Sequence, residues 1–571
     1  MGVLTEPRAE RLDEALLAEE PEPRGRRIPT GVAVVALVLV YVGVIALGDA
    51  RAASGSDAGG KLATVAAMAD HSSWAPDLGY WAEDADPDGL NHPLWHTTPT
   101  GGQWLQATSL PFALAAVPLW TLGGAGGVLL LTIAGGVIAA LAARRLAQQL
   151  GAGEGWAAFW LVGAAGPVLV YTGDFWEHAP AAGLALLAIS LALSAETPWR
   201  GLVAGLVGGL AVVLRAEMLL YVGVFGIASL AIGDERRRLL ARPRRVLALA
   251  AGLAVPVVLN AGLERLLVDE GVRDGRAGEV VSGVGQGAAT RLTDAAVTSI
   301  GLFPTDEPMA LLLGALTLLC LVILAVHVLW PEKVGRELGV LAAVAVGLLY
   351  AIRLLSGLGF VPGFLMVAPL AVVGAIGART PRERLLAATG LGALPLVWLT
   401  AWQGNHVAQW GGRYLLLSGA LLTIVATSVL TRRDAWRGPM AIVVAAAVST
   451  AVVGAGWHIE RTSTIADAVA VVESAPDDVV IVSDMAHLGR EGGAGYGDHR
   501  WVRSESEGDP RSAVATALAS GAERIDLVVL VDADTPDPEA PDLDGVEPVG
   551  PDRRVDWILG QHLLIRGYAI P

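Results

Sequence analysis

Two short acidic clusters are the strongest indication of chemistry in this chain. The first contains Asp57 in the run SDAGGK, which ends at Lys61, and the second is the run DFWEH, which contains Asp174, Glu177 and His178. A carboxylate can take a proton from an attacking hydroxyl group, and such a cluster could also bind a sugar or a divalent cation. The alternative is that these acids only cap helix ends and hydrate a surface, where charges are well tolerated.

Familiar catalytic signatures are absent from the sequence. It contains no Walker motif, HExxH motif, GxSxG motif or metal-spaced Cys/His set. The glycine-rich stretch Gly489–Gly497 lacks the helix start that a phosphate-cradling loop needs. We therefore expect a solvent-exposed loop there.

Thirteen apolar stretches surround these clusters and predict a polytopic α-helical membrane protein. The chain is 53% hydrophobic and 17% charged, with a mean hydropathy of +0.54, and most stretches approach the ~20 residues that cross a bilayer. The predicted spans are Pro29–Gly48, Gly123–Ala143, Gly155–Gly173, Ala179–Ala195, Gly201–Leu214, Met218–Gly233, Val246–Leu263, Pro308–Trp330, Leu338–Leu354, Gly357–Ala378, Leu385–Trp402, Leu415–Leu430 and Pro439–Gly456. The fifth and sixth are short and predict a tight hairpin around Arg215 and Glu217.

Loop charges predict the orientation of the spans. Arg-rich loops alternate with acidic ones, which places residues 1–27 in the cytoplasm as a tail and the C-terminus outside. Residues 49–122 then form a large outer loop whose apolar end, Gln106–Trp120, is expected to lie at the interface as a helix. Residues 264–307 form a second outer loop. The whole is a multi-pass protein of the cytoplasmic membrane.

The last segment, residues 457–571, predicts a small extracytoplasmic α/β domain. Val479–Val482 and Ile525–Val531 are β-branched runs typical of buried strands, and Arg511–Ser520 lies between them with helix-start and helix-stop signals. A strand–helix–strand crossover is the economical interpretation. We expect this domain to carry no catalytic group.

The order of these segments resembles the GT-C glycosyltransferase superfamily, in particular its protein mannosyltransferase-like and aminoarabinose transferase-like branches. Short local matches are Pro93–Pro111, Ala142–Leu146, Arg215–Glu217 and Trp410–Leu415, the last of which contains the run GRYL. One feature departs from the pattern: an acidic pair usually follows the first span, whereas here Asp49 stands alone.

The resemblance implies a polyprenyl-phosphate sugar donor, an acceptor that is a cell-envelope glycan, lipid or protein, and no nucleic acid. It implies an inverting transfer on the outer face of a bacterial cytoplasmic membrane. Asp57 is the first choice of general base, with Asp174 and Glu177 as the other catalytic candidates. Lys61, Arg215 and Arg413 are the cations expected to hold the lipid phosphate, and Asp57 and Arg413 are expected to act as one unit.

Further substrate contacts are expected from His178, Glu217, Tyr414 and the loop aromatic Trp81, because flat rings can stack on sugars. A divalent cation near Asp174, Glu177 and His178 is possible. Two other classes of function stay open: a non-catalytic membrane scaffold of GT-C ancestry, and a lipid or polysaccharide transporter. Transport is disfavoured because the spans are nearly free of charge and show no internal repeat.

Overall fold

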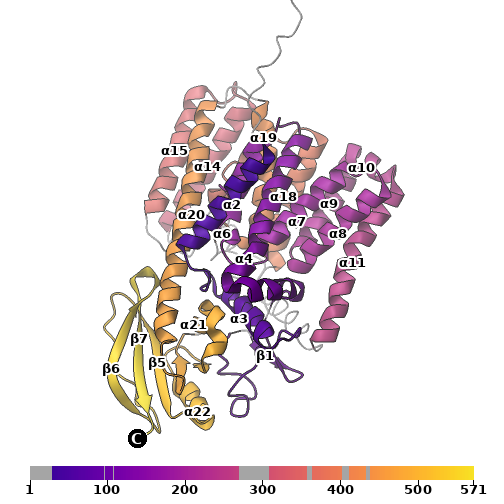
Figure 1. Cartoon of the computed structure of the whole chain (residues 1–571). Coiled ribbons are helices and arrows are strands. Elements are labelled where there is room, and N and C mark those ends of the chain that lie inside the picture. The colour runs from indigo at the N-terminus through magenta and orange to yellow at the C-terminus, as the bar shows by residue number, and fades with distance from the viewer. Residues whose placement is uncertain are drawn as a thin grey trace, which may run out of the picture.

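The computed structural model describes residues 29–95, 97–106, 108–268, 308–355, 363–400, 410–432, 437–485 and 487–571. The predicted cytoplasmic tail and most of the predicted second outer loop lie outside these ranges. Long helices form the body of the described chain, and a small sheet lies at one end of it (Figure 1). In the described ranges, five helices are long and apolar enough to cross a membrane.

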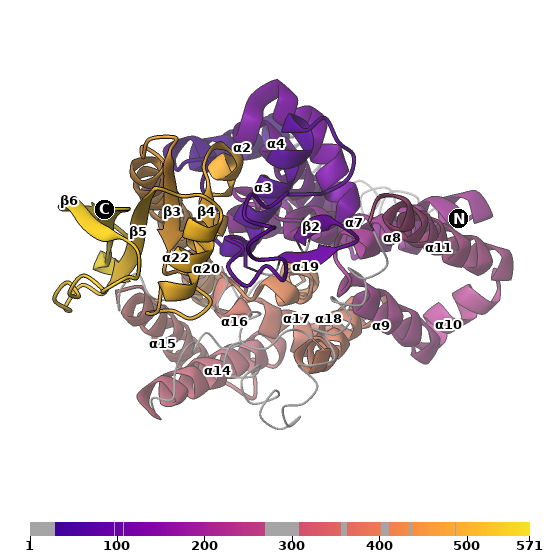
Figure 2. The same ribbon diagram turned by 90° about the horizontal axis from the view of Figure 1, so that it is seen from below.

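The first half of the chain is helical apart from one hairpin. Its elements are α2 (Thr30–Leu47), α3 (Ser56–Asp70), β1 (Thr97–Thr100), β2 (Gln103–Gln106), α4 (Leu110–Gln149), α5 (Trp156–Gly163), α6 (Val168–Thr172), α7 (His178–Ser194), α8 (Pro198–Leu214), α9 (Met218–Ala231), α10 (Gly233–Leu240) and α11 (Pro243–Leu267). The hairpin β1–β2 and α3 lie at the same end of the body as the C-terminal sheet (Figures 1 and 2).

The second half adds further helices before the sheet begins. These are α14 (Pro308–Leu329), α15 (Arg336–Leu355), α16 (Phe364–Val367), α17 (Ala371–Gly377), α18 (Pro381–Thr400), the 3₁₀ turn η2 (Arg413–Leu415), α19 (Leu416–Thr431) and α20 (Arg437–Val472). The last helix continues well past Gly456 and runs from the helical body to the sheet (Figure 1).

Helix α4 contains the break that the sequence predicted between an interface helix and a span. Its backbone is non-helical at Gly123 and at Gly124, where φ is +56° and ψ is −146°. Only glycine adopts that conformation readily, because a Cβ would clash with the backbone. The two parts of α4 are therefore free to take different directions.

The third predicted span, Gly155–Gly173, is wrong as a single helix. Helix α5 ends at Gly163 and α6 begins only at Val168. Pro167 immediately precedes α6, and proline lacks the N–H that a continuous helix would need there. The interruption lies within this predicted span, and only the short helix α6 separates it from the acidic turn that holds Asp174.

The tenth predicted span, Gly357–Ala378, is also broken in its described part. Helix α16 is separated from α17 by three residues that include Pro369. The residue before it, Ala368, has φ −130° and ψ 57°, outside the helical region, as expected before a proline. The apolar run alone did not reveal this interruption.

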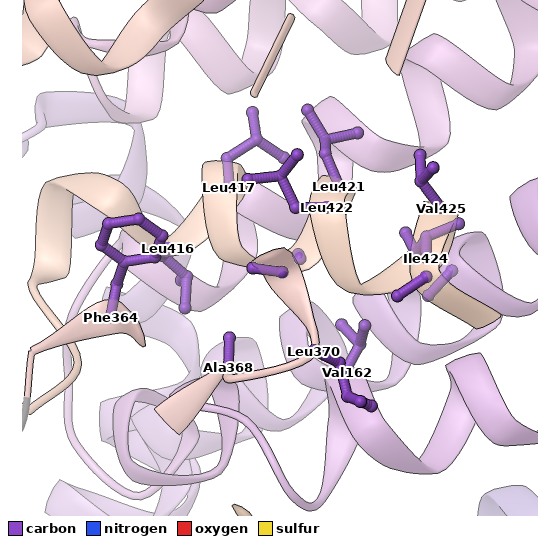
Figure 3. Close-up of a cluster of buried hydrophobic side chains, with 14 of the residues drawn as sticks. Val162, Phe364, Ala368, Leu370, Leu416, Leu417, Leu421, Leu422, Ile424 and Val425 are labelled. Atoms are coloured by element: carbon purple, nitrogen blue, oxygen red, sulfur yellow. The ribbon is translucent and has the colours of Figure 1, made fainter. Parts of the chain in front are cut away.

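Helix α19 is the centre of the helical core. All of its residues from Leu416 to Leu430 are buried, which is the pattern of a helix surrounded by others. In Figure 3, Leu416 lies near Phe364 of α16, Leu370 lies beside Val162 of α5, and Leu417 and Leu421 point to the opposite side of α19. Because η2 leads directly into this helix, the residues of η2 are anchored by the best-packed part of the chain.

The C-terminal region is a five-stranded mixed sheet in the order β4-β3-β5-β7-β6. Its strands are β3 (Val479–Ser483), β4 (Trp501–Arg503), β5 (Arg524–Val531), β6 (Glu547–Asp556) and β7 (His562–Ala569), with short helices α21 (Leu488–Glu491), η4 (Gly493–Asp498), α22 (Arg511–Ala519) and η5 (Ile558–Gly560). Strand β3 pairs in parallel with both β4 and β5. The two predicted strands and the helix between them are confirmed.

Candidate active site

Three distant segments meet at the first turn of α3. Asp57 Oδ2 accepts a hydrogen bond from Arg413 Nη1 of η2 at 2.6 Å. Asp57 Oδ1 accepts one from Arg490 Nη2 of α21 at 2.5 Å. One carboxylate is thus held between a guanidinium from the helical body and a guanidinium from the C-terminal region.

Glycine allows α21 to come this close to α3. A Cβ on Gly59 would collide with the backbone carbonyl of Arg490, and one on Gly493 would collide with the carbonyl of Gly59. The glycine-rich stretch Gly489–Gly497 was predicted to be a solvent-exposed loop, and this is wrong. It forms α21 and η4, whose residues from Leu488 to Glu491 are buried.

The charges around Asp57 keep it ionised. Burial would raise the pKa of Asp57, but the positive charges of Arg413, Arg490 and Lys61 hold it well below its usual range. The Asp57 side chain is 36% exposed, whereas those of Arg413 and Arg490 are only 4% and 3% exposed. The carboxylate therefore lies on the open side of a buried pair of cations.

Lys61 extends this cluster one turn further along α3. Its Nζ forms a short, buried ion pair with Glu177 Oε2. Glu177 Oε1 also accepts a hydrogen bond from the backbone N–H of Ser109 at 3.4 Å. Burial would raise the pKa of Glu177, but the charges of Lys61 and Arg215 lower it, so this acid is also held as a carboxylate.

Asp174 has a different environment. Its Oδ2 accepts hydrogen bonds from Ser54 N at 3.1 Å and Ser54 Oγ at 2.5 Å, and its Oδ1 accepts one from Phe175 N at 2.9 Å. Burial raises the pKa of Asp174 above its usual value, although His458 and these hydrogen bonds oppose the shift. No arginine or lysine ion pair to this acid is seen among the described residues.

The remaining predicted residues surround the cations. Arg215 Nε donates to Glu217 Oε1 at 2.9 Å, and His178 Nδ1 lies 3.8 Å from the same oxygen. The Tyr414 ring centroid lies 4.9 Å from the Arg413 guanidinium carbon and 5.1 Å from that of Arg215. Such cation–π contacts orient both guanidinium groups.

Trp81 is not part of this arrangement. Its Nε1 donates to the carbonyl of Trp501 in β4 at 2.8 Å, and the guanidinium of Arg500 lies 5.6 Å from its ring centroid. Trp81 belongs to the segment 49–122, and the structure places its ring against the sheet. The sugar-stacking role that the sequence suggested for Trp81 stays a prediction.

The residues proposed for a divalent cation do not form a ligand set. Asp174 binds Ser54, Glu177 binds Lys61, and His178 approaches Glu217. Within the described ranges, no three His, Cys, Asp or Glu side chains lie close enough together to hold a metal ion. The donors present in this region therefore do not fit a metal.

Sequence reasoning missed two residues of this site. Arg490 and Ser54 were not candidates, yet they contact Asp57 and Asp174 directly. The available signal was the pair of glycine-rich runs, SDAGGK and GREGGAGYG. Two such runs can indicate two backbones in close contact rather than two loops.

Comparison with solved structures finds several similar chains. ArnT from Cupriavidus metallidurans, bound to undecaprenyl phosphate, has a TM-score of 0.52 at 13% identity over 94% of this chain and 98% of that chain. An oligosaccharyltransferase from Archaeoglobus fulgidus has a TM-score of 0.44 at 13% identity, over 86% of this chain and 67% of that chain. Arabinosyltransferase EmbB from Mycobacterium smegmatis has a TM-score of 0.32 at 18% identity, over 95% of this chain and 50% of that chain.

No protein-family model and no curated protein matches the sequence. The structural likeness to ArnT covers nearly the whole of both chains. The chain has the GT-C fold, so the resemblance suggested by its segment order is confirmed at the level of the fold.

Proposed function

We propose that this protein is a membrane glycosyltransferase that moves a sugar from a polyprenyl-phosphate donor to an acceptor outside the cytoplasmic membrane. The observation that carries this proposal is the cluster around α3, where four cations face three carboxylates. The cations are Lys61, Arg215, Arg413 and Arg490, and the carboxylates are Asp57, Glu177 and Glu217. The excess positive charge suits a leaving phosphate, whose charge grows as the sugar departs.

In the proposed reaction, the acceptor hydroxyl attacks the anomeric carbon of the donor. A carboxylate takes the hydroxyl proton, a new bond forms between carbon and the acceptor oxygen, and the bond to the phosphate oxygen breaks. The electron pair of the broken bond stays on the phosphate, beside the guanidinium groups. A single displacement of this kind inverts the anomeric configuration, and Asp57 is the proposed base. Asp174 lacks the adjacent cations, and Glu177 is committed to Lys61.

The nature of the donor is supported by fold and chemistry together. ArnT, which shares this fold, is seen bound to undecaprenyl phosphate. In our chain, two buried arginines supply the fork-shaped donors that recognise phosphate well. The proposed acceptor is a glycan, a lipid or a protein of the cell envelope.

The proposed orientation follows from the loop charges. Residues 1–27 lie in the cytoplasm, and residues 457–571 lie outside, over the end of the helical body that carries α3. A reporter enzyme fused after Pro571 should be active only if it works outside the membrane. Cytoplasmic reporter activity at this position would reverse the topology.

The function is tested with purified protein in lipid nanodiscs. A set of polyprenyl-phosphate sugars is offered with extracts of cell-envelope acceptors, and release of polyprenyl phosphate is followed together with the anomeric configuration of the product. Acceptor-dependent release with inversion is expected. Movement of the lipid or glycan across the bilayer without sugar transfer would instead indicate a transporter, and neither activity would indicate a scaffold.

A further inference from the structure

The two arginines that hold Asp57 have hydrogen-bonding capacity that Asp57 does not use. Arg413 and Arg490 are both almost fully buried, and the Nε atom of each has no hydrogen-bond partner. Buried guanidinium donors are normally satisfied, because leaving them unpaired destabilises the folded state. Their unpaired state indicates that a ligand with more acceptor oxygens than a carboxylate completes the site.

Asp57 occupies the position where such a ligand would bind. Its two oxygens each take one N–H, from Arg413 and from Arg490. The two guanidinium groups thus already bind a planar anion between them, each through one N–H, as they would bind two oxygens of a phosphate. Because the carboxylate is the exposed member of the group, it can leave while the arginines stay in place.

The two ion pairs also make Asp57 a poor base in this state. Each guanidinium stabilises its ionised form, so the carboxylate binds a proton only weakly. Removing either guanidinium from the carboxylate strengthens the base. Any anion that competes for Arg413 and Arg490 therefore activates Asp57.

We propose that the donor phosphate displaces Asp57 from Arg413 and Arg490. On this view Arg490, from the C-terminal region, is a phosphate-binding residue of the active site, and donor binding releases Asp57 to act as the base. This inference rests on the proposed function and adds to it the order in which donor binding and proton transfer occur. The donor binds first, and only then can the acceptor hydroxyl lose its proton to Asp57 as the anomeric carbon–phosphate bond breaks.

The close approach of the two backbones explains how a residue so late in the chain can take part. Ala53 N donates to the carbonyl of Glu491 at 3.2 Å, and Arg461 of α20 donates to both Ser54 O and Glu491 Oε1. These contacts fix α21 beside α3. Arg490 is therefore held in place by the frame around it and does not depend on Asp57 alone for its position.

The test measures equilibrium binding of undecaprenyl phosphate to the full-length protein in nanodiscs, with no sugar or acceptor present. Arg490→Gln should weaken binding by about 10- to 100-fold, the effect of one charge-assisted contact. Asp57→Asn should tighten binding by about tenfold or more, because it removes the internal competitor. Arg500→Gln, a matched loss of one arginine from the C-terminal region at the edge of β4, should leave binding unchanged.

Folding is checked separately by thermal unfolding of each variant. If Arg490→Gln does not fold, Arg490→Lys keeps the charge but loses the fork and should weaken binding less. Unchanged or weaker binding in a folded Asp57→Asn variant overturns the inference, as does normal binding in a folded Arg490 variant, while the proposed function stands if the wild type still transfers sugar. Failure of the wild type to bind this lipid at all would instead overturn the proposed function.

Discussion

Asp57 and Asp174 are the same kind of residue in two opposite environments. Asp57 is one-third exposed and bound to two arginines, whereas Asp174 is buried and bound to a serine and a backbone amide. The pKa of Asp57 is lowered by its neighbours, and that of Asp174 is raised by burial. The neighbouring cations, and not burial alone, therefore determine which of the two carboxyl groups has a lowered pKa and lies beside groups that can bind a phosphate.

The difference arises from which segments each acid connects. Asp57 joins the helical body to the C-terminal region through Arg413 and Arg490. Asp174 joins the acidic turn before α7 to the first outer loop through Ser54. In the proposed mechanism the first contact is exchanged for a ligand, and only its carboxylate is partly exposed. The second is an internal hydrogen-bond network whose loss would leave buried polar groups unpaired.

The largest expected effect separates the two acids by activity. Asp57→Asn keeps the shape of the side chain but cannot accept a proton, so turnover should fall by about 10²–10⁴-fold. Asp174→Asn should reduce turnover by less than about tenfold, since Asp174 is proposed to support the fold and not the chemistry. Sugar-transfer rates of both variants at saturating donor decide this. The reverse order would make Asp174 the base.

The next effect concerns Glu177, which is buried like Asp174 but paired with a cation like Asp57. Glu177→Gln leaves Lys61 charged and unpaired inside the protein, which should destabilise the fold by about 3–5 kcal/mol. The double variant Glu177→Gln/Lys61→Met removes the stranded charge and should recover much of that loss. Denaturant unfolding of the wild type, of Glu177→Gln and of the double variant measures these differences in the free energy of unfolding. A small effect of Glu177→Gln alone would mean that Lys61 readily finds another partner.

A smaller effect should distinguish charge from shape at Arg413. Arg413→Lys keeps the positive charge but loses the fork and the flat face that lies over Tyr414. Donor affinity should fall by about tenfold, the equivalent of one good hydrogen bond. Ser54→Ala, which changes the partner of Asp174, is the matched control and should leave donor affinity unchanged. Equal losses in the two variants would mean that the environments of the two acids are not independent.

The sequence predicted much of this site because its main residues lie at the ends of helices. Helix α8 ends at Leu214 and α9 begins at Met218, so Arg215 and Glu217 fall in the predicted turn. Apolar runs and loop charges locate such turns well. They do not reveal interruptions such as the one at Pro369, where the residues on both sides remain apolar.

The contribution of the C-terminal region could not be predicted in the same way. Arg490 lies over four hundred residues after Asp57, and only the folded chain brings α21 against α3. Its neighbouring glycines looked like a loop, since glycine suits both loops and close backbone contacts. Trp81 is a different case, because an aromatic residue that suits a sugar also suits the surface of a sheet, and the sequence alone does not separate the two roles.

The smallest effect is a difference in how stability depends on pH. The pKa of Asp174 is higher in the folded protein than in the unfolded chain, so its contribution to stability is fully present below the unfolded value and is lost as pH rises through the folded value. The pKa of Asp57 is lower in the folded protein, so its contribution is present above the unfolded value and is lost as pH falls through the folded value. Asp174→Asn, which cannot titrate, should therefore gain stability relative to the wild type as the pH rises above the unfolded value of about 4. Above about pH 4 the stability difference between Asp57→Asn and the wild type should stay constant, and it should shrink only as the pH falls below about 4. Thermal unfolding from about pH 3 to about pH 7 measures both dependences. A stability difference for Asp57→Asn that grows with pH above about 4, in the direction expected for Asp174→Asn, would show that the two aspartates share one environment after all.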